Sequence, residues 1–150
     1  MLKTDFYPNV LLTPHFHLNE FLYSKYIDDT NNVDLLQRQC SIDTAIINNL
    51  QSLCQCVLEP ARIWLDAPIK INSGYRCDKL NLFVGGVHHS QHLFGEAADI
   101  TCDNNRELFE YIKDNLDFDQ LICYGDSEHP RFLHVSYDCA MFNRKEVLYK

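Results

Sequence analysis

The apolar residues between Ser41 and Pro68 recur at steps of three and four positions. This spacing places them on one face of an α-helix, and Ser41 or Asp43 can cap its first turn. The stripe consists of Ile42, Ile46, Leu50, Leu53, Val57 and Ala61. We therefore expect one long helix that ends before Pro68 and packs this face against the core.

Shorter patterned segments lie around this helix. Residues 18–22 favour a short helix, and residues 78–83 favour a helical turn that the Gly85-Gly86 pair ends. Asp103 is expected to cap a helix that runs through Ile112. Alternation of apolar and polar residues predicts four strands, over residues 68–72, 97–102, 119–124 and 132–137. Helices first and strands later indicate an α+β fold with a small antiparallel sheet packed against helices.

The composition limits the size and the partners of the protein. A chain of 150 residues, 46% of them apolar, suits one compact domain. The net charge of −8 argues against nucleic acid as a partner, because affinity for phosphates comes from Lys and Arg.

No apolar stretch approaches the ~20 residues of a membrane span, so we expect no membrane insertion. The N-terminus lacks a signal peptide pattern, so we expect synthesis in the cytoplasm. The seven cysteines, an odd number found mostly in apolar stretches, indicate reduced thiols.

Two residues of the stretch 90–99 are suited to metal chemistry. A hydrolytic zinc site takes three protein ligands from imidazole and carboxylate groups and leaves a fourth position to water. His92 and Asp99 supply two such ligands. Gly95 lies between them, and a passage from loop to strand can bring both to one point.

The best third ligand is His134, in the predicted strand 132–137. Alternation sends Leu133 and Val135 to one face of the strand and His134 to the other, where it can point into a cleft. Taken alone, such a histidine is better explained as a hydrogen-bonded structural residue. Its combination with His92 and Asp99 favours a single zinc site in a cleft.

Several short motifs occur together in this order: Asn72-Ser73-Gly74-Tyr75-Arg76, Asn81 followed by Gly85-Gly86, SxHxxGxAxD from Ser90 to Asp99, and Leu133-His134-Val135. In order and spacing they resemble the zinc D-alanyl-D-alanine carboxypeptidase family. That family includes bacterial dipeptidases acting on D-Ala-D-Ala and phage endolysins cutting L-alanyl-D-glutamate bonds. We therefore divide one zinc peptidase-like domain, residues 1–150, into a lead-in segment (1–40), a family core (41–137) and a C-terminal tail (138–150).

The resemblance implies roles for individual residues. His92, Asp99 and His134 correspond to the three ligands of the zinc ion, Zn²⁺, which would lower the pKa of its bound water towards ~7. Arg76 corresponds to an arginine that contacts substrate, and its planar fork suits a carboxylate or a polarised carbonyl. The alternative for Arg76 is a surface ion pair. Ser90 either binds substrate or orients His92, and an ordinary loop residue explains it nearly as well.

The general base is the point at which the sequence departs from the family pattern. In the relatives a glutamate takes the proton from the zinc-bound water, and the two positions where it occurs hold Arg131 and Tyr124 here. The candidate bases are instead Glu128 first and Asp126 second, both in the loop 125–130, with His129 as a third option. Their alternatives are a solvated charge for Glu128 and a turn residue for Asp126.

The sequence therefore predicts a zinc metallopeptidase that hydrolyses a peptide bond in bacterial peptidoglycan, with the stem peptide as its partner. Either a D-Ala-D-Ala carboxypeptidase or an L-Ala-D-Glu endopeptidase would fit, encoded by a phage or prophage as an endolysin. Such a protein would act on the cell wall after release or as a virion component. The missing glutamate motivates an alternative, a catalytically inactive zinc-binding domain that serves as a wall-binding or virion structural module.

Overall fold

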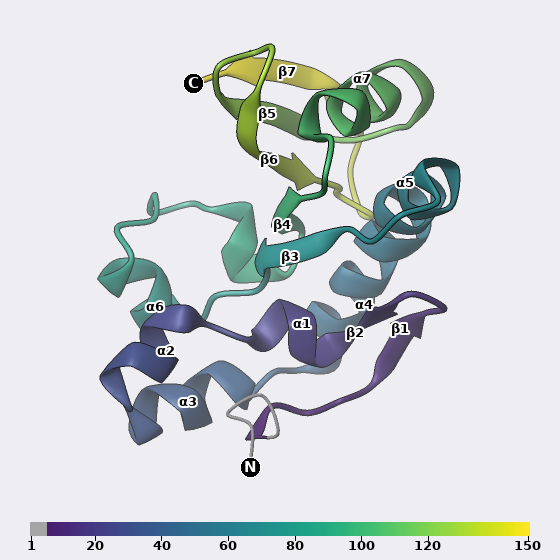
Figure 1. Cartoon of the computed structure of the whole chain (residues 1–150). Coiled ribbons are helices and arrows are strands. Elements are labelled where there is room, and N and C mark those ends of the chain that lie inside the picture. The colour runs from purple at the N-terminus through teal and green to yellow at the C-terminus, as the bar shows by residue number, and fades with distance from the viewer. Residues whose placement is uncertain (1–5) are drawn as a thin grey trace.

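The computed structural model describes residues 6–150, so the first five residues of the predicted lead-in segment lie outside the description. At its centre is a sheet with the strand order β3-β4-β6-β5-β7 (Figure 1). The strands are β3 (Lys70–Ser73), β4 (Ala97–Thr101), β5 (Gln120–Gly125), β6 (Pro130–Ser136) and β7 (Glu146–Tyr149). Neighbouring strands are antiparallel except β7, which runs parallel to β5. The predicted α+β fold is confirmed, and the sheet is larger than expected by this parallel strand.

The predicted long helix runs from α4 (Thr44–Leu53) through a π-helical turn, η2 (Cys54–Leu58), into α5 (Glu59–Leu65). Asp43 caps it, because the Asp43 side chain accepts a hydrogen bond from the Ile46 amide. Pro60 has no amide hydrogen to continue the regular ladder, and just before it the Glu59 amide bonds the Cys54 carbonyl five residues back. The helix ends at Asp66, in the left-handed conformation, before Pro68 as predicted.

Two more predicted helices lie where the sequence pattern placed them, at α1 (Leu18–Leu22) and α6 (Asp78–Phe83). The helix expected after Asp103 is α7 (Asn105–Asn115), but Asp103 is not its cap. Asn104 takes that position and accepts a hydrogen bond from the Glu107 amide at 3.1 Å. The prediction was wrong by one residue because Asp and Asn are both good caps, and only the path of the backbone selects between them.

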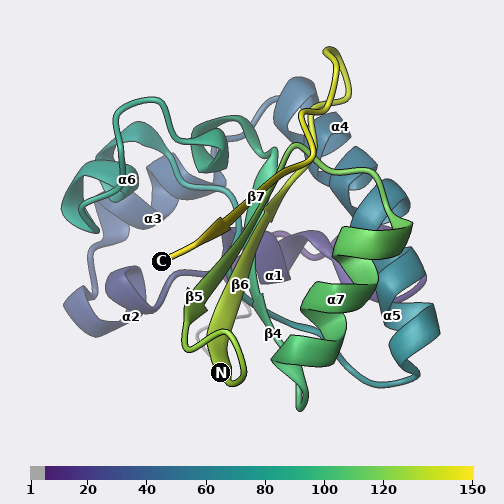
Figure 2. The same cartoon turned by 90° about the horizontal axis from the view of Figure 1, so that it is seen from above.

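The two faces of the sheet have different neighbours. Helices α5 and α7 cover one face, and α6 lies on the other side with α2 (Lys25–Thr30) and α3 (Val33–Cys40) (Figure 2). Leu133 and Val135 point into the core formed with α4, η2, α5 and α7, and both are fully buried. By alternation His134 projects from the opposite face of the sheet, on the side of α6 (Figure 2).

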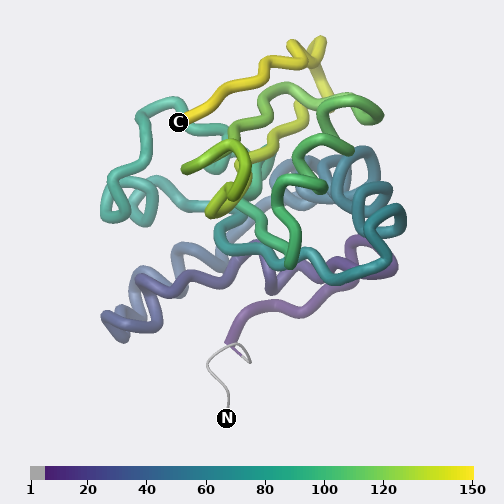
Figure 3. The backbone as a smooth tube through the Cα atoms, turned by 45° about the horizontal axis from the view of Figure 1, so that its top comes forward, coloured from purple at the N-terminus to yellow at the C-terminus, as the bar shows by residue number. Residues whose placement is uncertain are grey.

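Both ends of the chain add structure to this centre. In the lead-in segment, β1 (Leu11–Thr13) and β2 (Phe16–His17) form a small hairpin of their own. The predicted C-terminal tail, residues 138–150, returns along the sheet and contains β7, which lies beside β5 (Figure 3). Among residues 6–150 no helix has the length and apolar character that crossing a membrane requires.

Candidate metal centre

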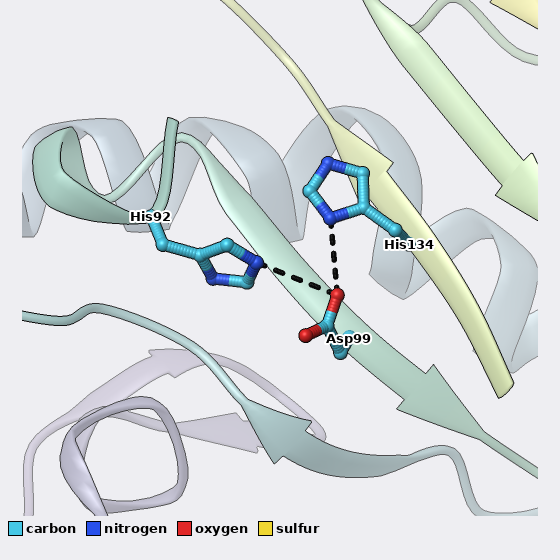
Figure 4. Close-up of side chains that lie close together, drawn as sticks. All are labelled: His92, Asp99 and His134. Atoms are coloured by element: carbon cyan, nitrogen blue, oxygen red, sulfur yellow. Dashed lines mark hydrogen bonds and ion pairs between the residues drawn. The ribbon is translucent and has the colours of Figure 1, made fainter. Parts of the chain in front are cut away.

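The three predicted zinc ligands converge on the face of the sheet from which His134 projects (Figure 4). His92 lies in a 3₁₀ turn, η3 (Gln91–Phe94), which precedes β4. Asp99 lies in β4, and His134 is its direct partner across the ladder in β6. One ligand atom from each side chain lies within 4.8 Å of the other two. We call His92, Asp99 and His134 the metal cluster.

One carboxylate oxygen is the centre of this cluster. Asp99 Oδ1 lies 3.4 Å from His92 Nε2 and 3.0 Å from His134 Nδ1. The two imidazole rings are 5.1 Å apart between centroids and inclined at 66°. Two nitrogens and one carboxylate oxygen, all aimed at one small volume, form the donor set of an open tetrahedral zinc site.

The orientation of His92 shows which of its nitrogens is free. His92 Nδ1 lies 2.6 Å from the Gly74 carbonyl oxygen, which can only accept, so Nδ1 carries the hydrogen. The lone pair of the neutral ring is therefore on Nε2 and faces the Asp99 carboxylate. A cation between these electron-rich atoms makes their approach favourable, and a backbone carbonyl behind the ring is a common support for a metal-binding histidine. The residues present thus fit zinc.

Two glycines explain how the chain reaches this geometry. A Cβ on Gly74 would lie 2.6 Å from backbone atoms of Phe21, so only glycine lets the end of β3 pack on α1 with its carbonyl facing His92. Gly95 ends η3 with a φ of +71°, and a Cβ there would lie 2.9 Å from the Ile46 carbonyl oxygen. Glycine adopts this left-handed conformation without strain.

Ser90 caps the turn that carries His92. Its hydroxyl oxygen accepts a hydrogen bond from the His92 amide at 3.3 Å, and the residue is buried. The His92 carbonyl in turn accepts from the Arg76 amide at 3.0 Å. Ser90 was predicted either to bind substrate or to orient His92. This geometry fits the second role.

Arg76 links the cluster to its surroundings. Its Nη2 donates to Asp99 Oδ2 at 3.3 Å, its Nη1 to Asn81 Oδ1 at 3.1 Å, and its Nε to the Ser73 hydroxyl at 3.1 Å. A guanidinium has five N–H groups, so these three bonds leave donors for a further acceptor. Gly86 protects this arrangement, because a Cβ there would lie 2.0 Å from Asn81 Oδ1 and 2.9 Å from Arg76 Nη1.

A pocket of about 270 Å³ lies beside Arg76. Most of its wall is polar or aromatic and comes from the start of α2, the end of β3 and α6: Tyr23, Ser24, Lys25, Tyr26, Asn72, Ser73, Tyr75, Arg76, Leu80 and Val84. The pocket has room for a few substrate atoms. Arg76, which lines the pocket and also contacts Asp99, links this space to the metal cluster.

Burial and hydrogen bonding set the charge states of the cluster. Burial lowers the pKa of His92 and outweighs the opposing effect of Asp99, which favours the neutral, metal-binding imidazole. Burial alone would raise the pKa of Asp99, but the hydrogen bond with His134 helps to hold it well below its usual range. Burial also lowers the pKa of Arg76, against the attraction of Asp99.

The predicted bases lie in the β5–β6 loop and have partners outside the metal cluster. Glu128 forms an ion pair with Arg106 of α7, the helix on the face opposite His134. Asp126 accepts a hydrogen bond from the Glu128 amide at 2.8 Å within the β5–β6 loop. Neither carboxylate belongs to the group that the structure brings together at the metal cluster.

Sequence reasoning missed part of the support for the cluster. The Gly74 carbonyl is a backbone atom, so no residue type marks it in the sequence. Asp119 is a buried carboxylate that accepts a hydrogen bond from Gln91, the residue before His92, at 3.0 Å. Its position at the start of a predicted strand was visible, but nothing local connects it to residue 91.

Comparison with known proteins agrees with this geometry. The family model described as Peptidase M15 matches residues 15–136, which is well over half of the chain. The match begins before the core predicted from the motifs and includes every residue of the metal cluster. No curated protein matches the chain. The chain therefore belongs to the Peptidase M15 family, the zinc D-Ala-D-Ala carboxypeptidase-like peptidases.

Proposed function

We propose that this protein is a zinc peptidase that hydrolyses a peptide bond in the stem peptides of bacterial peptidoglycan. The observation that carries the proposal is the convergence of His92, Asp99 and His134, each with one ligand atom within 4.8 Å of the others, in a chain of the Peptidase M15 family. When bound there, zinc would supply an activated water and polarise the scissile carbonyl.

The residues around the cluster have separate tasks in this proposal. Gly74 and Ser90 hold His92 with its Nε2 turned to the metal position. Arg76 would use its remaining N–H groups to bind an anionic group of the substrate beside the pocket. Because Arg76 also contacts Asp99, bound substrate would be fixed relative to the metal.

The finer assignment is a D-Ala-D-Ala carboxypeptidase or an L-Ala-D-Glu endopeptidase. In both bonds the residue on the amine side carries a free carboxylate close to the bond that is cut, and Arg76 suits such a group. We further propose a phage or prophage endolysin that acts on the wall after release or as part of the virion. In the active protein, Glu128, with Asp126 second, would accept the proton from the water, which requires the Glu128–Arg106 ion pair to open.

A second candidate is a catalytically inactive zinc domain that binds wall peptides or serves as a virion component. Two observations favour this candidate. Glu128 is paired with Arg106. Among the described residues, the metal cluster contains one carboxylate, Asp99, which would be a zinc ligand and so is not available as a base. This candidate keeps zinc binding and gives up hydrolysis.

Digestion of purified peptidoglycan separates the two candidates. The zinc-loaded protein should release peptide fragments that mass spectrometry assigns to one bond, and a chelator or Asp99→Asn should abolish the release. Zinc binding without any fragment across a range of pH would favour the inactive domain. Under the proposed assignment Glu128→Gln should lower the rate at least 100-fold, in line with the loss of a general base. Full turnover in both Glu128→Gln and Asp126→Asn would exclude these two residues as the base.

A further inference from the structure

Asp119 connects two segments that lie far apart in the sequence. Its side chain is 7% exposed. Asp119 Oδ1 accepts from the Arg144 amide at 3.1 Å and from Arg144 Nε at 2.9 Å. Asp119 Oδ2 accepts from Arg144 Nη2 at 2.6 Å and from Gln91 Nε2 at 3.0 Å. A buried carboxylate thus holds the C-terminal segment with one set of bonds and the turn η3 with another.

The bond to Gln91 acts directly beside a zinc ligand. Gln91 is the first residue of η3, and His92 is the second. The Gln91 carbonyl also accepts from the Glu96 amide at 3.1 Å, so Gln91 joins the start of the turn to the start of β4. A rotation of Gln91 would move the backbone that aims His92 at Asp99.

The partner of Asp119 lies in a well-anchored segment. Arg144 comes shortly before β7, and the Glu146 amide donates to the Asp119 carbonyl at 2.9 Å. The preceding loop is closed by the Asp138 amide, which donates to Asn143 Oδ1 at 2.9 Å. This segment lies beyond residues 15–136, which the family model matches. A part of the chain outside the family match therefore contacts the support of the metal cluster.

A second arginine offers an internal comparison. Arg38 makes the same two-pronged pair with Asp78, with both distances at 2.8 Å. There both side chains are about half exposed or more, and such surface pairs contribute little. The Arg144 pair differs because its carboxylate is buried and has Gln91 as a further partner. A buried carboxylate depends on all of its donors.

We propose that Asp119, held by Arg144, is a positioning residue for the zinc ligand His92 and acts through the side chain of Gln91. The C-terminal segment, residues 138–150, then supports the metal centre through Arg144. This inference rests on the zinc site of the proposed function but does not require hydrolysis. Its test is zinc affinity, measured by competition with a chromophoric chelator on the full chain.

Gln91→Ala and Arg144→Ala should each weaken zinc binding about tenfold, the lower end of what the loss of an outer-shell partner costs. Arg38→Ala is the matched control, since it removes the same charge and the same bond geometry, and it should leave the affinity within twofold of the unaltered protein. Loss of a cation by itself favours a bound Zn²⁺, so weaker binding in Arg144→Ala reports lost positioning instead of lost charge.

Two further measurements exclude a general loss of stability. The double variant Gln91→Ala/Arg144→Ala should bind no more weakly than either single variant, because both changes break one chain of contacts. With Co²⁺ in the site, the visible absorption bands of Gln91→Ala should shift, whereas those of Arg38→Ala should not. If Arg144→Ala does not fold, the zinc affinity of Gln91→Ala alone tests the positioning role.

Unchanged affinity in Gln91→Ala, or an equal loss in Arg38→Ala, would overturn the positioning role and leave the proposed function intact. Failure of the unaltered protein to bind zinc would overturn both.

Discussion

Two clusters in this protein place imidazole against a largely buried carboxylate, and they are built in opposite ways. In the metal cluster, two rings approach the same oxygen of Asp99. We call Thr13, His15 and Glu59 the hairpin cluster. There each oxygen of the Glu59 carboxylate has its own hydrogen-bond partners. Glu59 Oε1 lies 2.5 Å from His15 Nδ1, and Glu59 Oε2 accepts from the Thr13 hydroxyl at 2.8 Å and the His15 amide at 3.3 Å.

The two clusters differ in whether hydrogen-bond donors within the cluster satisfy the carboxylate. The hairpin cluster satisfies its carboxylate from within and fastens the β1–β2 turn to the start of α5. In the metal cluster Gly74 already takes the hydrogen of His92 Nδ1, so a lone pair faces Asp99. The lone pair that His92 turns toward Asp99 is therefore what distinguishes the metal cluster from the hairpin cluster.

The largest expected contrast is in zinc content. His134→Ala should reduce bound zinc from about one ion per chain to none after dialysis, because it removes one of three ligands. His15→Ala should keep the full zinc content. Elemental analysis of the dialysed proteins measures both. A loss of zinc in His15→Ala, with the fold intact, would show that the two clusters are not independent.

The hairpin cluster should matter for stability. Glu59→Ala leaves the buried Thr13 hydroxyl without its acceptor and removes the partner of the more exposed His15, which should lower the free energy of unfolding by about 2 kcal/mol. Urea unfolding in the presence of chelator measures the loss. Zinc at 100 times its dissociation constant should then restore about 2.7 kcal/mol to this variant and to the unaltered protein alike. Restoration in only one of them would indicate coupling between the clusters.

The smallest expected effect is on the response to acid. Burial raises the pKa of Glu59, but hydrogen bonds from His15 and Thr13 outweigh it, so the folded-state pKa lies below the ordinary value of 4.5. A lowered carboxyl pKa stabilises the fold above that ordinary value, and this contribution disappears as the pH falls through the folded-state pKa. Glu59→Gln should therefore flatten the decline of zinc-free stability in the acidic range. Parallel pH profiles for the two proteins would contradict this.

The sequence pattern predicted those features that depend on residues close together in the chain. The helical stripe from Ile42 to Ala61 and the alternation around His134 are periodic, so they report which face of an element is buried wherever that element lies. The metal cluster followed because residue type and spacing limit which side chains can form an open zinc site. The hairpin cluster was not predicted, because Thr13 and Glu59 are 46 positions apart and share no pattern.

What the sequence determined by itself was the α+β class, the course of the main helix and the three residues of the metal cluster. The tertiary structure decided the rest: the parallel placement of β7, the pairing of Glu128 with Arg106, and the bonds from Asp119 to Gln91 and Arg144. The physical reason is range. Periodicity and ligand chemistry act within a few residues, whereas a salt bridge or a β-ladder depends on how segments far apart in the chain are brought to one place.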